Sequence, residues 1–177
     1  MIITIAGKPG SGKSTVAKLV AKELRYKHYS IGNLMRQVAK EKNVSLLKLS
    51  RLAEKNPKID LLLDKKSALL GKQKDNFVMD TRLGFYFIPH SIKIFLDVNL
   101  NTAAKRILKN KRKNEKYKNI KEAKKKLLER MKSEKMRYKK YYNINHFDKK
   151  HFDIVINTSK KSPKLIKEHI LKKIRKV

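Results

Sequence analysis

Cysteine is absent from this sequence of 177 residues, and acidic residues are few. The absence of cysteine excludes disulfides, thiol nucleophiles and thiolate metal sites. No apolar run approaches the roughly 18 residues that a membrane span requires. The N-terminus already has the pattern of a strand and a loop, so we expect no signal peptide. These absences favour a cytoplasmic protein without a membrane partner, and the length suits one domain with a full core.

The scarcity of acidic residues leaves a formal net charge of +32, from 47 basic and 15 acidic side chains. Such an excess can serve a nucleic-acid partner, because lysine and arginine release counterions when they contact phosphates. The alternative is a generally basic proteome. Lysine supplies 38 of the basic residues and is spread over nearly every predicted helix, whereas a dedicated RNA surface is more often patchy and contains arginine. We favour a generally basic proteome as the origin of the charge and leave a nucleic-acid partner open.

One glycine-rich stretch, residues 7–14, organises the chain. It reads Gly-Lys-Pro-Gly-Ser-Gly-Lys-Ser and fits the phosphate-binding pattern G-x-x-x-x-G-K-[ST]. Residues 2–6 before it are apolar and β-branched, as in a buried strand, and residues 15–24 after it have the apolar spacing of a helix. Lys13 is expected to reach the β- and γ-phosphates, and Ser14 to ligate Mg²⁺. The residues predicted to bind ATP are Gly7, Lys8, Pro9, Gly10, Ser11, Gly12, Lys13, Ser14 and Thr15.

The remaining chain alternates short apolar runs with helical patterns. Further strands are predicted at residues 27–30, 76–80, 92–98 and 152–157. Helices are predicted from about 30 to 42, across 44–72 with a break at Asn56-Pro57, from about 99 to 108, from 120 to 142 and from 162 to 175. Five strands alternating with helices indicate an α/β fold, with a five-stranded parallel sheet and helices on both faces.

Several polar side chains lie at the ends of predicted strands or on one face of a helix. Asp80 ends a buried strand and can hold Mg²⁺, directly or through water. Arg82 can grip a phosphate with a two-pronged contact. Arg36 follows the second strand at the sheet edge where α/β proteins bind ligands, although a surface arginine is the alternative. Asp60 and Asp64 share a helix face, either toward a second substrate or as a solvated pair.

Residues 109–119 are rich in lysine and lack an apolar face, which is typical of a solvated loop or a mobile lid. In the next helix, Arg130 and Arg137 lie seven residues apart and therefore on one face. Aromatic side chains crowd the end of this helix and can stack on nucleic-acid bases. Packing is the commoner role of such side chains, and we expect it here. These aromatic residues are Tyr138, Tyr141 and Tyr142.

A set of further motifs accompanies the phosphate loop. They are Ser-x-Gly-x-x-x-Arg at 30–36, Ile-Asp-x-x-x-Asp at 59–64, Arg-Leu-Gly at 82–84, Arg-x-x-x-Glu-x-x-Arg-Tyr at 130–138, Tyr-Asn-Ile at 142–144 and Phe-Asp-Ile-Val-Ile-Asn-Thr-Ser at 152–159. With these motifs the chain resembles, over nearly its whole length, the nucleoside monophosphate kinases, and most closely the archaeal-type cytidylate kinases. The phosphate loop alone is shared by many unrelated NTPases, whereas the combination is much more specific.

The resemblance implies an adenylate-kinase-like P-loop kinase with strand order 2-3-1-4-5. It implies a single kinase domain over residues 1–177, monomeric and acting on small-molecule nucleotides. The expected parts are a core of residues 1–32, 73–108 and 145–177, a clamp for the acceptor nucleotide at about 33–72, and a lid at about 109–119 that continues into a helix at 120–143.

The resemblance also implies ATP with Mg²⁺ as phosphate donor and CMP or dCMP as acceptor. Catalytic roles would fall to Lys13, Arg106, Arg130 and Arg137, with Arg112 beside Arg106 at the edge of the lid. Acceptor binding would fall to Arg36, Asp60, Asp64 and Arg82. The metal would be held by Ser14 and, through water, by Asp80.

Two positions depart from the family pattern. Asn33 stands where such kinases commonly carry aspartate, and Asp80-Thr81-Arg82 replaces the more usual Glu-Gly-Arg or Asp-Gly-Arg turn. These departures bear on the identity of the acceptor more than on kinase activity.

The function predicted from the sequence is ATP-dependent phosphorylation of a nucleoside monophosphate, CMP or dCMP above all. One alternative, motivated by the charge, is an RNA- or ribosome-associated NTPase on the same fold. The other is a P-loop kinase for a different small molecule, in which Asp80 would serve as base for a hydroxyl acceptor.

Overall fold

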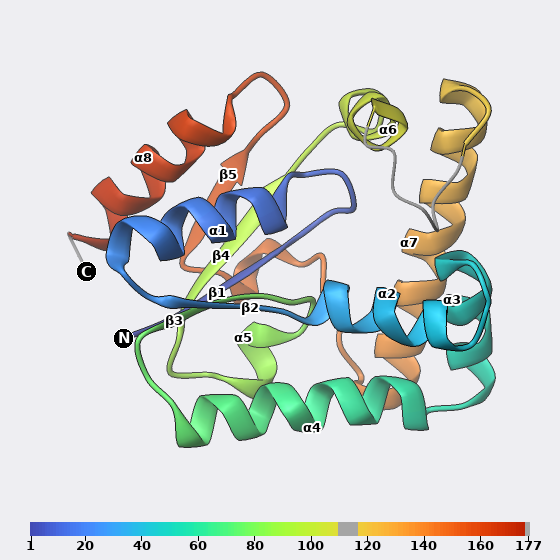
Figure 1. Cartoon of the computed structure of the whole chain (residues 1–177), viewed down its shortest axis with the longest axis horizontal. Helices are drawn as coiled ribbons and strands as arrows, with labels where there is room; N and C mark the ends of the chain where they lie inside the picture. Colours follow the sequence, from blue (N-terminus) through green and yellow to red (C-terminus); the bar gives the residue numbers. More distant parts are fainter. Residues whose placement is uncertain (110–116, 176–177) are drawn as a thin grey trace.

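The computed structural model describes residues 1–109 and 117–175. Its centre is a parallel sheet of five strands in the order β2-β3-β1-β4-β5 (Figure 1). The strands are β1 (Ile2–Gly7), β2 (Lys27–Ser30), β3 (Phe77–Asp80), β4 (Ile92–Asp97) and β5 (Ile154–Asn157). Both the predicted fold class and the predicted strand order are confirmed.

Several helices begin at a short polar side chain that caps them. The helices are α1 (Lys13–Leu24), α2 (Ile31–Glu41), α3 (Leu46–Lys55), α4 (Lys58–Gln73), α5 (Gly84–Phe87), α6 (Leu100–Lys109), α7 (Ile120–Tyr142) and α8 (Pro163–Ile174), with a 3₁₀ turn at Lys149–His151. The side chains of Ser30, Ser45 and Ser162 accept hydrogen bonds from the first turns of α2, α3 and α8. The predicted break at Asn56-Pro57 separates α3 from α4.

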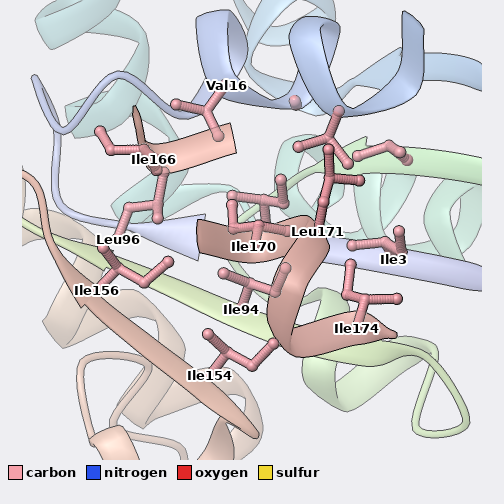
Figure 2. Packing of buried hydrophobic residues seen from close by; sticks show 14 of the residues in the cluster. Ile3, Val16, Ile94, Leu96, Ile154, Ile156, Ile166, Ile170, Leu171 and Ile174 are labelled. Carbon is pink, nitrogen blue, oxygen red and sulfur yellow. The ribbon is translucent and has the colours of Figure 1, made fainter. Parts of the chain in front are cut away.

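Helices cover both faces of the sheet, because successive side chains of a strand point to opposite faces. Ile3 and Ile5 of β1 pack with α1 and α8 in the largest apolar cluster, part of which Figure 2 shows. Ile2 instead packs with Phe77, Met79 and the buried Ile88 in a separate cluster. In Figure 1, α4 and α5 lie on the side away from α1 and α8.

Helix α7 lies beside the sheet and packs against both α6 and α3 (Figure 1). Its contact with α6 is apolar and includes Ala104, Ile107, Ala123 and Leu127. Within the described residues, no helix combines the length and the apolar character that crossing a bilayer would need.

The strand register determines where the functional side chains meet. Ile5 of β1 pairs with Asp80 of β3, and Asp80 pairs in turn with Ser30 of β2. Gly7 pairs with Leu96 of β4. The carboxyl ends of these strands therefore share one edge of the sheet, which is where parallel α/β sheets bind ligands.

Candidate active site

A cavity of about 410 Å³ opens at this edge of the sheet. Its walls come from the glycine-rich loop, from α2 and α4, from the end of β3, and from α6 and α7. Most of the site residues expected from the sequence line it: Pro9, Gly10, Ser11, Gly12, Lys13, Ser14, Thr15, Arg36, Asp60, Asp64, Asp80, Arg82, Arg106 and Arg130. The fold thus gathers residues that lie more than a hundred positions apart in the chain.

The glycine-rich loop has a backbone that only glycine adopts readily. Gly7, Gly10 and Gly12 have φ angles of +143°, +78° and +89°. A Cβ atom on Gly10 would lie 2.8 Å from the backbone and Cβ of Ala103 in α6. The hydroxyl oxygen of Ser11 is buried and has no hydrogen-bond partner within the described part of the chain. A buried polar atom beside a glycine cradle at a helix N-terminus fits a bound phosphate.

Lys13 lies against the loop itself. Its Nζ donates hydrogen bonds to the carbonyl oxygens of Gly7, at 2.9 Å, and Lys8, at 3.0 Å. Burial, together with the nearby Arg82 guanidinium, holds the pKa of Lys13 well below its ordinary value. A bound phosphate would supply the negative charge that this cation lacks, so the site favours an anionic ligand.

Asp80 is held in its ionised form beside the loop. Its two carboxylate oxygens receive hydrogen bonds from Ser30 Oγ at 2.9 Å and from His28 Nε2 at 3.0 Å. Burial opposes ionisation, but these bonds and the charge of Lys13 keep the pKa of Asp80 below its ordinary value. An ionised carboxylate and the Ser14 hydroxyl line one cavity, and oxygen donors of this kind fit Mg²⁺.

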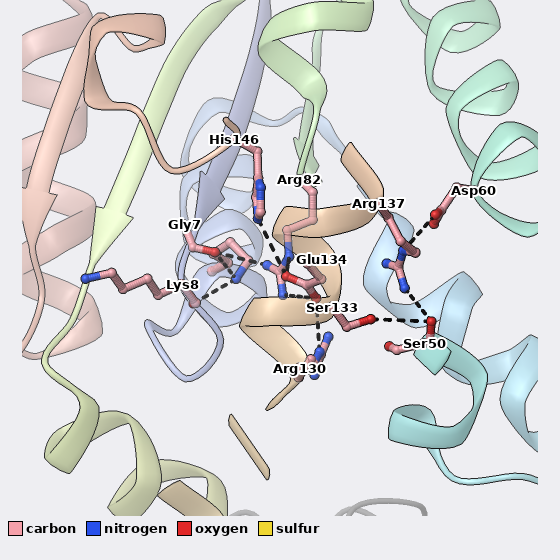
Figure 3. Close-up of polar contacts among 11 residues, drawn as sticks. Gly7, Lys8, Ser50, Asp60, Arg82, Arg130, Ser133, Glu134, Arg137 and His146 are labelled. Atoms are coloured by element: carbon pink, nitrogen blue, oxygen red, sulfur yellow. Dashed lines mark hydrogen bonds and ion pairs between the residues drawn. The ribbon is translucent and has the colours of Figure 1, made fainter. Parts of the chain in front are cut away.

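Glu134 of α7 is the centre of the polar network in Figure 3. Arg82 grips its carboxylate with two hydrogen bonds, Nε to Oε2 at 2.8 Å and Nη2 to Oε1 at 3.1 Å. Arg130 donates from Nε to Oε1 at 3.0 Å. Burial opposes ionisation, yet the two arginines hold the pKa of Glu134 well below its ordinary value. Arg82 also donates from Nη1 to the carbonyl oxygen of Gly7 at 3.0 Å.

No role was predicted for Glu134 from the sequence, although it belongs to the motif at 130–138. The one local signal was its spacing of four residues from Arg130, which places the two side chains on one helix face. Its bond to Arg82 spans 52 positions and left no local signal. His146 was also missed. It is buried, and its Nε2 lies 3.8 Å from Glu134 Oε2.

Arg137 does not line the cavity, contrary to the expectation that it faces the transferred phosphoryl group. Its Nε lies 2.8 Å from Asp60 Oδ2, and its Nη1 donates to the carbonyl oxygen of Ser50 at 2.8 Å. Its side chain is 2% exposed and is enclosed by Asp60 of α4 and the Ser50 carbonyl of α3, whereas the next residue, Tyr138, lines the cavity. Arg137 thus joins α7 to α3 and α4.

Asp64 lines the cavity from α4 and accepts a hydrogen bond from the hydroxyl of Tyr142 at 2.5 Å. Burial, reinforced by the nearby Asp60, raises the pKa of Asp64 from 3.8 to about 7. Tyr138 is buried, and the Tyr141 hydroxyl donates to the carbonyl oxygen of Ala53 at 2.9 Å. The expectation that the tyrosines of α7 pack is therefore confirmed.

The two remaining arginines line the cavity from different helices. Arg36 lies on α2 and donates to the side chain of Asn33. Arg106 lies on α6 and donates to the carbonyl and hydroxyl oxygens of Thr158, at 2.7 and 3.2 Å. Arg112, expected at the edge of the lid, lies outside the described residues.

This fold, with a phosphate loop at the carboxyl edge of its parallel sheet, defines a P-loop protein. Solved structures of the same fold include shikimate kinase from Bacteroides thetaiotaomicron, with a TM-score of 0.66 and 12% identity over 99% of this chain and 98% of that one. A protein from Eubacterium ventriosum described as uncharacterized has a TM-score of 0.72 and 22% identity, also over 99% of this chain and 98% of that one. At these identities the likeness shows the fold alone.

Sequence comparison shows which family of P-loop proteins the chain belongs to. Residues 2–160 match the cytidylate kinase-like family. The cytidylate kinase of Methanobrevibacter smithii is 33% identical, over 97% of this chain and 96% of that protein, and that of Sulfurisphaera tokodaii is 35% identical, over 92% and 89%. The chain belongs to the cytidylate kinase-like family, and the resemblance seen in its motifs is confirmed. It is a nucleoside monophosphate kinase.

Proposed function

We propose that this protein transfers the γ-phosphoryl group of ATP to CMP or dCMP in the presence of Mg²⁺. The observation that carries the proposal is a single cavity that combines a phosphate loop and its lysine with Arg36, Arg82 and Arg130. Two polyanions can be held side by side only where several cations converge. Membership of the cytidylate kinase-like family supports cytidine nucleotides as acceptors.

On the donor side, the N–H groups of the glycine loop and Lys13 would bind the β- and γ-phosphates of ATP. Ser14 would contribute a direct ligand to Mg²⁺ and Asp80 a ligand through water, and the ion would neutralise charge on the phosphates. Asp80 is suited to this task because His28 and Ser30 keep it ionised.

On the acceptor side, Arg36 and Arg82 would bind the phosphate of the monophosphate, and Asp60 and Asp64 would lie toward its nucleoside. An oxygen of the acceptor phosphate forms a bond to the γ-phosphorus while the bond from that phosphorus to the bridging oxygen breaks, and ADP leaves. The acceptor phosphate is already an anionic nucleophile, so the reaction needs positioning and charge neutralisation rather than a protein base.

The test is a coupled assay of ADP release with ATP and Mg²⁺, run against CMP, dCMP, UMP, AMP and GMP, with RNA alone as control. We expect strong turnover with CMP, dCMP or both. Turnover without any monophosphate, raised by RNA, would contradict the proposal and favour an RNA-associated NTPase. Turnover only with an acceptor outside the panel would instead favour a different small-molecule kinase.

Replacement of the loop lysine supplies an independent check. Lys13→Ala should lower kcat by about a hundredfold to a thousandfold, the range seen when one preorganised donor to transition-state charge is removed. The variant should fold, because Lys13 is a half-buried cation whose loss relieves repulsion with Arg82. The matched control is Lys18→Ala, an exposed lysine on the same helix. Wild-type kcat in Lys13→Ala would exclude the donor site described above.

A further inference from the structure

Arg82 and Arg130 meet at one buried carboxylate. Glu134 is 3% exposed, and each of its two oxygens accepts at least one charged hydrogen bond from an arginine (Figure 3). The three side chains come from two distant segments, since Arg82 follows β3 whereas the other two lie one turn apart on α7. Among these three side chains, it is the Glu134 carboxylate that joins the loop after β3, through Arg82, to α7.

The hydrogen bonds leave both guanidinium groups able to bind a further anion. A guanidinium carries five N–H bonds, and the described contacts of Arg82 engage one each on Nε, Nη1 and Nη2. Arg130 contacts Glu134 through Nε, so its two Nη groups are not needed to hold it. Both side chains line the cavity. Glu134 can thus orient the two arginines without occupying all the donors that would face a phosphate.

Arg82 is tied to the donor loop by the same arrangement. The carbonyl oxygen of Gly7 accepts one hydrogen bond from Arg82 Nη1 at 3.0 Å and another from Lys13 Nζ at 2.9 Å. This one backbone oxygen therefore fixes how far Lys13, on the donor side, lies from Arg82, on the acceptor side. The carboxylate of Glu134 holds Arg82 in the orientation that makes this contact.

Charge balance explains why a carboxylate is needed at this position. Lys13, Arg82 and Arg130 are three cations around one cavity, and like charges at such separations repel one another strongly where water is excluded. Without an anion between them the arginine side chains would separate until a substrate arrived. Ordering them at that moment would add to the free energy of binding and of reaching the transition state.

We infer that Glu134 is a positioning residue, which fixes Arg82 and Arg130 relative to each other and to the phosphate loop before the acceptor binds. The inference rests on the proposed function, because its effect is read in the transfer of phosphate to a monophosphate. It assigns to Glu134 no contact with either substrate. Its action is to preorganise two side chains that do make such contacts.

Two substitutions separate position from charge. Glu134→Gln keeps the shape and removes the charge, whereas Glu134→Asp keeps the charge and withdraws the carboxylate by roughly 1.5 Å, one C–C bond. Glu129→Gln is the matched control, since Glu129 lies on the same helix in an exposed ion pair with Arg51. For each protein we would measure KM for the acceptor, KM for ATP, kcat, and the melting temperature.

Both Glu134 variants are expected to lower kcat divided by the acceptor KM by about tenfold or more, the effect of losing a charged hydrogen bond. The ATP KM should change less than threefold, because the glycine loop and Lys13 are intact. Assays are run well below each melting temperature, and Glu129→Gln should match the wild type. If one Glu134 variant melts too low to assay, the other is measured well below its own melting temperature with the same expectation.

Three outcomes would overturn the inference. One is wild-type acceptor kinetics in both Glu134 variants despite a lower melting temperature, which would make Glu134 structural. Another is an equal loss of kcat/KM for ATP and for the acceptor. The third is wild-type kinetics in Glu134→Asp alone, which would mean that a negative charge near this position is sufficient and the exact position of the carboxylate is not needed. If the proposed function itself is wrong, the wild type will turn over no monophosphate. In that case the rise in melting temperature that inorganic pyrophosphate causes can still be compared between the wild type and the Glu134 variants.

Discussion

At the scale of single residues, two buried carboxylates in the cavity wall are kept ionised by cationic partners or strong hydrogen-bond donors. Glu134 has Arg82 and Arg130, and Asp80 has His28 and Ser30. Asp64 differs, because its described hydrogen bond comes from a neutral hydroxyl and its pKa is raised to about 7. A buried carboxyl of this kind favours the protonated state.

The raised pKa makes a prediction about stability. Between about pH 4 and 7 the native protein binds more protons at Asp64 than the unfolded chain does, so this group stabilises the fold at low pH and ceases to as pH rises through 7. Asp64→Asn removes the titration and keeps an oxygen for Tyr142. The variant should be more stable than the wild type at pH 8, by about 2 to 4 kcal/mol, since each tenfold change in proton affinity is worth about 1.4 kcal/mol.

The measurement is the free energy of unfolding in urea at pH 5 and pH 8 for the variant and the wild type. The difference between the two proteins should shrink toward pH 5. Glu168→Gln, at an exposed position on α8, is the control and should show little dependence on pH. A constant difference at both pH values would mean that Asp64 titrates in its ordinary range.

Residue identities in the site were partly predictable. The phosphate loop was identified because its geometry needs glycine at fixed spacings, and that requirement is visible in the sequence. Glu134 was not identified, because its partner Arg82 lies 52 positions away and helical periodicity does not say which neighbour a face meets. The position of Arg137 was misjudged for the same reason. Its spacing from Arg130 does not reveal that Asp60 and Ser50, distant in the chain, enclose its side chain.

At the scale of elements, α7 holds the site together. Its N-terminal half packs on α6, the arginine and glutamate in its middle reach the cavity, and its C-terminal half contacts α3 and α4 through Arg137, Asp60 and Tyr141. The strands, the helix caps and the break before α4 were predictable from local sequence. The division into core, clamp and lid stays a prediction, and residues 110–116 of the expected lid lie outside the described chain.

The Arg137 contacts predict a structural rather than a catalytic effect. Arg137→Met should lower the free energy of unfolding by about 3 kcal/mol, because it leaves the buried Asp60 without its counter-ion. The double variant Arg137→Met with Asp60→Asn should recover part of that loss. Urea unfolding measures the stability and steady-state kinetics the activity. A variant as stable as the wild type but without turnover would support instead the phosphoryl-facing role expected from the sequence.

At the scale of the whole molecule, the charge of +32 acts on both stability and substrate binding. Self-repulsion among the basic side chains opposes the compact state, and the same field attracts anionic nucleotides. Salt screens both effects, with a Debye length of about 10 Å at 0.1 M. We therefore expect the net charge to influence the kinase reaction whether or not it also meets a polyanionic partner.

Raising the salt concentration should thus have opposite effects on two quantities. The melting temperature should increase between about 20 mM and 300 mM NaCl as repulsion is screened, while KM for the nucleotides should increase severalfold as their attraction weakens. Sucrose at matched osmolality is the control for effects unrelated to charge. A KM that is independent of salt would show that the field does not assist binding.

The proposed reaction passes a phosphoryl group from ATP to a cytidine monophosphate rather than to water. The most direct measurement follows the label of γ-labelled ATP in the presence and absence of CMP, with Mg²⁺ in both. We expect the label to appear in CDP, with one CDP formed for each ATP consumed, and ATP to be nearly inert without CMP. Release of the label as inorganic phosphate at the same rate in both reactions would contradict this expectation.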